Sequence, residues 1–457
     1  MSATEISKSC IDFAYTFKLS DAPASTQDHA KKCLLDWLGC AIRGATMPQA
    51  ACIRKYTGTM GGNFHATIIG DPTPNSIFNT ALCNGYFSHI LEMDDVDKES
   101  ITHPGTVVIP AALSIGEWSQ IPGADFLAAI IAGYEVMLRV GAAVTPAHYQ
   151  IWHTTATSGV FGSAVAASRL LKLSREEMTW ALGNAGTLSA GLWEFLQDGA
   201  MSKYLHAGKA AATGVMTACL ANTGFTGASR ILEGAQGFFA GYARQEVNPA
   251  IFEDFGVRYR TGTVSFKPYP CCRHTHSAID CAKALHNQLA QSVDTVKDVR
   301  ISTYKAASSI AGNENPQDSR QAQFSLKYLV SHVLKNGTVG LSSFEDTALF
   351  DPDVRTLMEK VHVEIDPSID SLTPAAWPAK VTVTLLDGRE IVEFIKYPKG
   401  DPENPLDWNE VKEKFSFLVS GILNQQGIAK VISLCENIES VDDCGQLLQT
   451  VNRHGVF

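Results

Sequence analysis

Residues 380–395 read KVTVTLLDGREIVEFI, and this stretch sets the fold class of its part of the chain. Apolar and polar side chains alternate on both sides of Asp387-Gly388, and Asp-Gly between two alternating runs predicts a two-residue β-hairpin. Two further alternating runs, 299–304 and 361–365, precede it, with helix-like segments between them. We therefore expect residues 266–398 to form an α+β domain with a small antiparallel sheet.

The rest of the chain has the pattern of packed helices. Residues 30–41 carry apolar side chains at a spacing of about 3.6 residues, which is typical of an amphipathic helix. Small residues are frequent in 155–167, as in helices that pack closely together. After the turn-rich stretch 399–405, residues 409–435 are helical again and can rejoin the first helical part. We expect a mainly α protein with a helical bundle over residues 1 to 265.

Length, charge and cysteine content narrow the class of protein. The 457 residues exceed what one hydrophobic core usually serves, so two domains are expected. With a net charge of −10 and no basic run, the chain lacks the charge pattern of a nucleic-acid-binding protein. Its 11 cysteines are scattered and include no CxxC pair, which favours reduced thiols. No signal-peptide pattern or uninterrupted apolar span is evident, so we expect a cytoplasmic protein with no membrane partner.

The stretch SHILEMDD (residues 88–95), followed by THPG (102–105), is the first candidate for chemistry. It places three carboxylates and two imidazoles between apolar neighbours. An ordinary helix end, with acids near its terminus, is the alternative interpretation. If residues 89–95 are helical, Glu92 and Asp95 lie three positions apart and share one face of the helix.

His103 is our candidate for moving a proton, because an imidazole beside carboxylates can have its pKa tuned around neutrality. We expect Glu92 or Asp94 to orient a histidine or a lysine, and Asp95 to contact the substrate. A metal site could combine His89, Glu92 and His103. Because no HExxH or similar motif supports such a site, we expect no metal.

Two further segments bring histidine and lysine to helices rich in small residues. His153 lies in the run YQIWHTT, which begins at Tyr149 and precedes such a helix, whose N-terminal amides favour an anion. Lys203 and His206 are three residues apart and fit one helix face. A structural histidine and a solvent-facing lysine are the alternatives. On the functional interpretation, His153 moves a proton, Lys203 holds a carboxylate and Tyr149 contacts the substrate.

The run FKPYPCCRHTH (residues 266–276) gathers cations at the expected domain junction. Its prolines stiffen the backbone, and a cationic cluster there suits a di- or tricarboxylate, because arginine and lysine pair with carboxylates. Lys267 and Arg273 are our candidates for holding carboxylates, with His276 and Cys272 beside them as substrate-binding residues. A thiol nucleophile at Cys271-Cys272 is the alternative, but partial burial of adjacent cysteines is more common and no Cys–His–Asn pattern accompanies them.

Four motifs follow one another along nearly the whole chain. They are HxxExDD…THPG (89–105), WHTTA…GxFGxAxAASRLLxL (152–173), KxLHAGxAAxxG (203–214) and KPYPCCRHTH (267–276). Together they resemble the 2-methylcitrate dehydratase (MmgE/PrpD) family, which also includes cis-aconitate decarboxylase and iminodisuccinate epimerase. The resemblance implies a homodimer whose subunit has a large all-helical domain, discontinuous in sequence (1–265 plus 399–457), and a smaller α+β lid domain (266–398).

The resemblance also implies an activity. Family members act on small di- or tricarboxylic acids without metal or organic cofactor. Motif matching carries their functional positions to Glu92, His103, His153, Lys203 and Lys267. The chain departs from the decarboxylase pattern at Val96, where many members have Thr, and at Cys272, where they have His.

We therefore expect a lyase, either a dehydratase or a decarboxylase, that acts on an acid such as 2-methylcitrate or cis-aconitate. The first alternative is an epimerase of an iminodisuccinate-type dicarboxylate, which shares the step of moving a proton next to a carboxylate. The second alternative is an inactive relative that binds a carboxylate.

Overall fold

The computed structural model describes residues 5–289 and 293–457, and the chain divides into two compact units. Unit 1 is Met1–Ser265 with Asp407–Phe457, and unit 2 is Phe266–Leu406. Of the described residues, 58% are helical and 8% lie in strands, so the expectation of a mainly α protein with a small α+β part is confirmed. Residues 399–406, which we placed with the helical part and which include the turn-rich stretch 399–405, lie in unit 2. There the N–H of Phe266 donates to the carbonyl of Gly400 at 3.0 Å.

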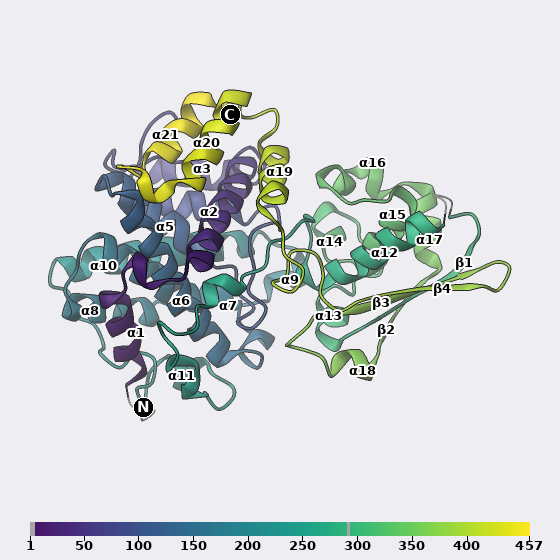
Figure 1. The fold of residues 1–457 in the computed structure, drawn as a ribbon, viewed down its shortest axis with the longest axis horizontal. Helices are drawn as coiled ribbons and strands as arrows, with labels where there is room; N and C mark the ends of the chain where they lie inside the picture. Colours follow the sequence, from purple (N-terminus) through teal and green to yellow (C-terminus); the bar gives the residue numbers. More distant parts are fainter. Residues whose placement is uncertain (1–4, 290–292) are drawn as a thin grey trace. The chain divides into compact units, whose positions relative to one another are not determined.

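Unit 1 is a bundle of helices from both ends of the sequence (Figure 1). Its helices are α1 (Ile6–Thr16), α2 (Ala24–Ala45), α3 (Ala50–Met60), α4 (Ile77–Ser88), α5 (Gly105–Trp118), α6 (Gly123–Val144), α7 (Thr154–Leu170), α8 (Arg175–Thr187), α9 (Phe195–Asp198), α10 (Ser202–Asn222), α11 (Phe238–Tyr242), α19 (Trp408–Val419), α20 (Gln425–Glu436) and α21 (Gln446–His454). The yellow helices α19 and α20 both contact α2, so the segment that follows unit 2 completes the bundle.

Helix α6 is long and apolar enough to cross a membrane by length and composition alone. In the structure, 94% of its most apolar window is buried. Glu135 and Arg139, two of the charged residues of this helix, form an ion pair in the interior. Glu135 also accepts a hydrogen bond from the N–H of Thr261 at 2.8 Å. These features are those of a core helix whose charges are compensated inside the bundle.

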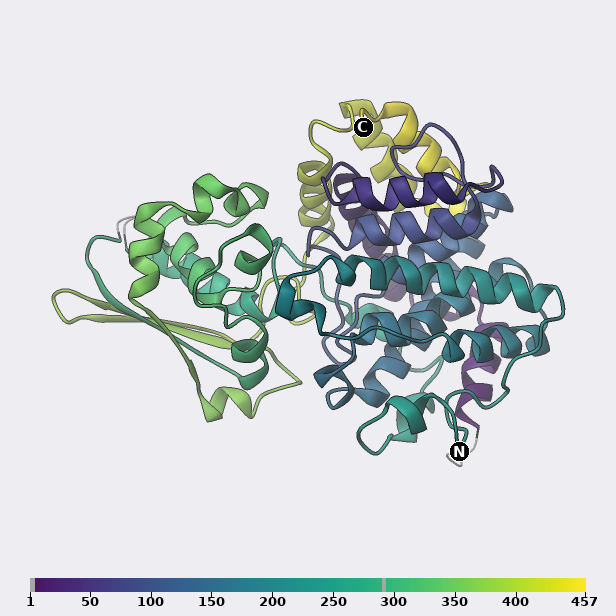
Figure 2. The ribbon, with the colours of Figure 1, turned by 180° about the vertical axis from the view of Figure 1, so that it is seen from behind.

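Unit 2 is built on a sheet with the strand order β2-β1-β3-β4, and its helices gather on one side of that sheet (Figure 1; Figure 2). The strands are β1 (Val296–Thr303), β2 (Val361–Ile365), β3 (Ala379–Leu385) and β4 (Glu390–Ile395). The helices are α12 (His276–Gln288), α13 (Lys305–Ile310), α14 (Ser319–Ala322), α15 (Leu326–Asn336), α16 (Asp346–Leu349), α17 (Pro352–Glu359) and α18 (Pro367–Asp370).

The hairpin at Asp387-Gly388 forms as expected, with β3 and β4 antiparallel and Gly388 at φ +87. The expectation of a wholly antiparallel sheet is wrong, because β2 pairs with β1 in parallel. A parallel pair requires a long crossover connection, and the helices between β1 and β2 supply one.

Glycines set the spacing between α4 and α10. A Cβ added at Gly208 in α10 would lie 2.2 Å from the carbonyl oxygen of Leu82 in α4. A Cβ added at Gly85 would lie 3.0 Å from the Cα of Gly208. This close approach fixes the first turn of α10, which carries Lys203, relative to the end of α4.

Gly208→Ala is therefore expected to destabilise the protein by about 1–3 kcal/mol, because the added methyl group must push α10 away from α4. Thermal or urea unfolding followed by circular dichroism measures the change. Gly58→Ala in α3 is the matched control, because a Cβ there meets nothing within 4 Å. The control is expected to stabilise by up to about 1 kcal/mol. Equal effects of the two substitutions would show that close packing at Gly208 is unimportant.

Candidate active site

Residues 89–104, which we call the site loop, join α4 to α5. The condition under which Glu92 and Asp95 would share a helix face is not met, because α4 ends at Ser88 and the chain continues in turns. The side chain of Asp94 bonds back to the ring of His89 at 2.8 Å. Glu92 has φ +57, a left-handed conformation that is unfavourable for a residue with a Cβ. As a result, Glu92 and Asp95 have different partners.

The carboxylate of Asp94 is the centre of a buried hydrogen-bond network. Its Oδ2 accepts from Nδ1 of His89 at 2.8 Å and from Nδ1 of His103 at 3.0 Å. Burial by itself would raise the pKa of Asp94, but the charges and hydrogen bonds of the two imidazoles outweigh burial and hold that pKa well below its usual range. Asp94 is therefore ionised although it is 1% exposed.

The hydrogen bonds of His103 also identify its tautomer. Its Nδ1 lies 2.8 Å from the carbonyl oxygen of Asp95, which can only accept a hydrogen bond, so one hydrogen is shared between this carbonyl and Oδ2 of Asp94. Nδ1 therefore carries the hydrogen, and Nε2 is the basic atom of the neutral ring. The backbone N–H of His103 donates to Oγ1 of Thr155 at 3.1 Å, which ties the site loop to the start of α7.

The rings of His89, His103, His153 and His206 form what we call the imidazole cluster. The ring of His153, at the N-cap of α7, stacks on that of His89 with centroids 5.7 Å apart and lies 6.5 Å from that of His103. Its Nδ1 is 3.2 Å from Nδ1 of His206 on α10. Burial lowers the pKa of His153 well below its usual value and that of His206 to about 4. Both rings are therefore neutral near pH 7, and one nitrogen donates to the other.

Lys203 lies in the first turn of α10 and forms an ion pair with Glu92. Both side chains are buried, and removing one partner of such a pair typically costs about 3–5 kcal/mol. The charge of Lys203 also contributes, after burial, to the low pKa values of His153 and His206. The turn at Glu92 thus holds an ammonium group beside the imidazole cluster.

Asp95 is bonded within the protein through both carboxyl oxygens. Oδ1 accepts from the N–H of Gly105 at 2.9 Å, and Oδ2 accepts from the hydroxyl of Tyr134 at 2.8 Å. Burial and then the charge of Asp36 raise the pKa of Asp95 to about 8. These bonds hold the start of α5, and a substrate contact at Asp95, as we expected, would compete with them.

Tyr149 is connected to the imidazole cluster through Trp193. The rings of Tyr149 and Trp193 have centroids 5.0 Å apart, and the ring of Trp193 lies 4.7 Å from that of His153. The Nε1 of Trp193 is buried and has no hydrogen-bond partner among the described residues. Trp193 therefore gives the cluster an aromatic side and a buried donor.

The cationic segment 266–276 begins unit 2. The guanidinium of Arg273 bonds to Asp401 at 2.5 Å and to the carbonyl of Lys399 at 3.0 Å. Arg273 also donates to Nδ1 of His276 at 2.9 Å. We expected Arg273 to hold a carboxylate of the substrate, but the carboxylate that it contacts in the structure is that of Asp401 in unit 2. His276 takes part in the same network.

Lys267 and Cys272 also belong to unit 2, and both are buried. The N–H of Cys272 donates to the carbonyl of Gln323 at 3.0 Å, which ties Cys272 to the end of α14. The expected site residues therefore form two groups. Unit 1 brings together Glu92, Asp94, Asp95, His103, Tyr149, His153 and Lys203, and unit 2 holds Lys267, Cys272, Arg273 and His276.

His89, Asp94 and His103 are close enough to hold a metal ion, since one potential ligand atom of each lies within 4.8 Å of the others. A ligating nitrogen must be deprotonated, however, and the bond from Nδ1 of His103 to the carbonyl of Asp95 requires a hydrogen on that atom. This bond excludes Nδ1 of His103 as a ligand atom and leaves its Nε2 available, so the geometry alone does not decide between a hydrogen-bond network and a coordination sphere. The expectation of no metal stays a prediction.

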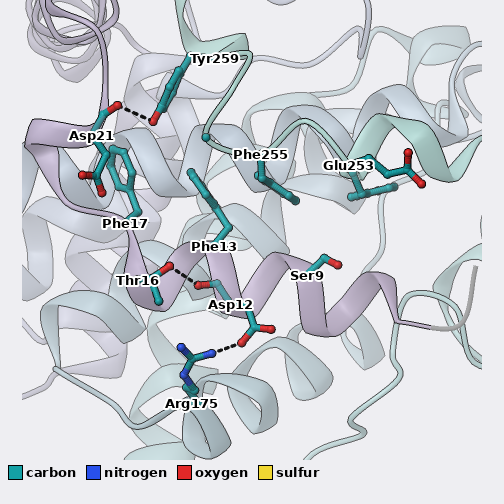
Figure 3. A pocket seen from close by; sticks show the side chains of 12 residues that line it. Ser9, Asp12, Phe13, Thr16, Phe17, Asp21, Arg175, Glu253, Phe255 and Tyr259 are labelled. Carbon is teal, nitrogen blue, oxygen red and sulfur yellow. Dashed lines mark hydrogen bonds and ion pairs between the residues drawn. The ribbon is translucent and has the colours of Figure 1, made fainter. Parts of the chain in front are cut away.

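A surface pocket of about 510 Å³ lies between α1 and residues 252–259 (Figure 3). Aromatic rings line it, and Asp12 pairs with Arg175 at its edge. Its acidic residues are Asp12, Asp21 and Glu253, against the single guanidinium of Arg175. An acidic pocket does not suit a polycarboxylate, so the imidazole cluster with Lys203 is the candidate active site.

Both parts of the chain match family models. Residues 9–249 match the MmgE/PrpD N-terminal domain, and residues 269–438 match the MmgE/PrpD C-terminal domain. The chain belongs to the MmgE/PrpD family. The resemblance inferred from the motifs is thereby confirmed.

Relatives within the MmgE/PrpD family match along nearly their whole length. A cis-aconitate decarboxylase-like protein of Aspergillus oryzae is 26% identical over 95% of this chain and 95% of its own. The human cis-aconitate decarboxylase is 27% identical over 92% of this chain and 88% of its own. The 2-methylcitrate dehydratase of Cupriavidus necator is 23% identical over 85% and 84%. Cis-aconitate decarboxylases and 2-methylcitrate dehydratases are lyases, so the chain belongs to an enzyme family of lyase type.

The candidate site of this MmgE/PrpD chain contains residues to which the sequence interpretation gave no role in the site. His206 lies one helical turn after Lys203, and the sequence analysis noted this spacing without giving His206 a role. His89 was noted only in the metal alternative, although the HxxExDD motif contains it. Trp193 has no local signal, because it meets His153 only through the fold.

The stability of the protein should depend on pH through Asp95. Its carboxyl has a pKa of about 8 in the fold and about 4 in the unfolded chain, so the folded protein alone keeps the proton between these values. The stabilisation is complete below about pH 4 and is lost as pH rises toward 8. Asp95→Asn mimics the neutral carboxyl and should remove this dependence.

Melting temperatures of the two proteins between pH 5 and pH 8.5 test this expectation. The melting temperature of the variant, relative to that of the original protein, should rise with pH. The expected rise is about 2 °C for each kcal/mol of unfolding free energy that the original protein loses. Parallel curves across this range would rule out a neutral, buried Asp95.

Proposed function

We propose that this chain is a lyase that acts on a small tricarboxylic acid, such as cis-aconitate or 2-methylcitrate, without metal or organic cofactor. The observation that carries the proposal is the buried Asp94–His103 pair, which lies in one network with His89 and beside the Lys203–Glu92 pair. The named activities of the relatives support the reaction type.

His103 is the proton carrier in this proposal. Dehydration and decarboxylation of such an acid each move a proton on a carbon next to a carboxylate. An imidazole is suited to that step near neutral pH. Asp94 holds Nδ1 of His103, so it orients the ring and stabilises the imidazolium when Nε2 takes a proton. Nε2 then removes the proton from the substrate or delivers it.

Lys203, His153 and His206 are proposed to bind the substrate carboxylates. Negative charge develops next to an existing anion, so fixed donors must lie where the charge appears. One well-placed donor contributes about 3 kcal/mol to the transition state. Glu92 fixes the ammonium of Lys203. In the neutral His153–His206 pair, the ring that accepts at Nδ1 keeps its Nε2–H and can donate it to a carboxylate without carrying charge.

Decarboxylation is the activity to test first. Decarboxylase relatives match at 25–28% identity, whereas 2-methylcitrate dehydratases and a related protein match at 22–24%. Dehydration needs a base for the carbon-bound proton and an acid for the leaving hydroxide, but decarboxylation needs one proton carrier. Burial lowers the pKa values of His153 and His206, so neither ring holds an imidazolium proton to deliver near pH 7. That leaves His103, with its ionised partner, as the proton carrier.

A substrate panel followed by NMR in D2O tests the function. The EDTA-treated protein is incubated separately with cis-aconitate, citrate, 2-methylcitrate and iminodisuccinate. We expect cis-aconitate to lose CO2 and the product to gain one deuterium. Loss of water from 2-methylcitrate would assign the dehydratase instead. Deuterium exchange without a leaving group, or no reaction with the panel, would contradict a tricarboxylate lyase, and loss of activity with EDTA would contradict metal independence.

His103→Ala is expected to lower kcat by at least about 10²-fold, the usual contribution of a positioned acid or base. Circular dichroism should show the same helix content as the original protein. His362→Ala is the control, because His362 lies on β2 with a side chain that is 63% exposed. Turnover by the His103 variant within about threefold of the control would remove His103 from this role.

A further inference from the structure

Lys414 brings a buried charge from α19 to the site loop. Its Nζ donates to Oδ1 of Asp36 on α2 at 2.5 Å and to the carbonyl oxygen of Met93 at 2.6 Å. The side chains of Lys414 and Asp36 are 6% and 0% exposed. Burial by itself would lower the pKa of Lys414, but the charge of Asp36, with a contribution from Asp94, outweighs burial and raises it. Lys414 is therefore charged.

The bonded carbonyl lies at a sensitive point of the site loop. Met93 stands between Glu92, which pairs with Lys203, and Asp94, which holds His89 and His103. The peptide unit is planar, so fixing its oxygen fixes the direction in which the chain enters Asp94. Glu92 precedes this unit in a left-handed conformation, which costs about 1 kcal/mol or more and persists only where surrounding contacts impose it.

The helices that carry Lys414 and Asp36 are held closely together. A Cβ added at Gly39 of α2 would lie 3.2 Å from Cδ1 of Leu418 and 3.3 Å from the ring of Phe415. Gly39 is three residues after Asp36, and Phe415 directly follows Lys414. The ammonium group therefore reaches Met93 from a rigid helix pair.

We propose that Lys414 is a positioning residue of the candidate active site. Through the carbonyl of Met93 it fixes the turn that directs Glu92 to Lys203 and Asp94 to the two imidazoles. The catalytic consequence rests on the proposed function, whereas the positioning does not. A merely structural ion pair would stabilise the contact of α2 with α19 and leave the hydrogen bonds of Asp94 unchanged.

A pair of double variants separates these roles. Asp36→Asn with Lys414→Met removes both charges and the donor to Met93. Replacing both members of a buried ion pair by uncharged residues is often neutral for stability, so we expect this variant to fold. Asp36→Asn with Lys414→Gln also removes both charges but keeps an amide donor. The control is Glu135→Gln with Arg139→Met, which removes a buried pair that bonds to residues 254–261.

The first readout needs no substrate. In protein labelled with ¹⁵N-histidine, the Nδ1–H protons of His89 and His103 are assigned by their loss in His89→Asn and His103→Asn. We expect the Met variant to exchange both protons with water at least about tenfold faster, because local opening follows loss of the contacts that hold the loop. The Gln variant and the control should retain both signals.

The second readout is turnover on the substrate found for the original protein. We expect kcat of the Met variant to fall at least about tenfold with KM nearly unchanged, since a shift of 1 Å can cost about 10²-fold. Retained imidazole signals in the Met variant, or their equal loss in the Gln variant, would overturn the positioning role. If the original protein turns over none of the panel, the proposed function fails, and the NMR comparison still decides the role of Lys414.

Discussion

The buried carboxylate of Asp94 is the constraint on which the candidate site depends. It stays ionised in the interior because N–H groups from His89 and His103 bond to the same oxygen. Those two bonds orient both rings through Nδ1, so the position of one carboxylate determines where the opposite ring nitrogens lie. Any shift of Asp94 would therefore move His89 and His103 together.

Charge around the site is compensated in separate ways at neighbouring positions. Lys203 is paired with Glu92, and Lys414 is paired with Asp36. Asp95 avoids a charge by holding its proton up to a pKa of about 8. Buried charges are tolerated only when they are paired or neutralised, so each arrangement removes a penalty that would otherwise oppose folding. The resulting interior holds fixed donors and acceptors that water does not screen.

The sequence predicted most where one physical rule acts on neighbouring residues. Alternation around Asp387-Gly388 identified β3 and β4, but alternation does not encode strand direction, and the parallel pairing of β2 was missed. Short motifs likewise identified candidate positions such as His103 and Lys203. The conformation of residues 89–95 could not be predicted from spacing, because the bond from Lys414 to Met93 joins residues 321 positions apart. Trp193 was not predicted for the same reason, because only the fold brings it to His153.

Unit 2 interrupts unit 1 in the sequence, and this order has a consequence for biosynthesis. The site loop leaves the ribosome 321 residues before its contact in α19, which corresponds to roughly 15–65 s at usual elongation rates of about 5–20 residues per second. During that interval the helices that α19 and α20 cover remain exposed, and Phe266–Leu406 can fold first. A translational stall inside this inserted unit leaves a nascent chain with an uncovered apolar surface, which is a substrate for holding chaperones.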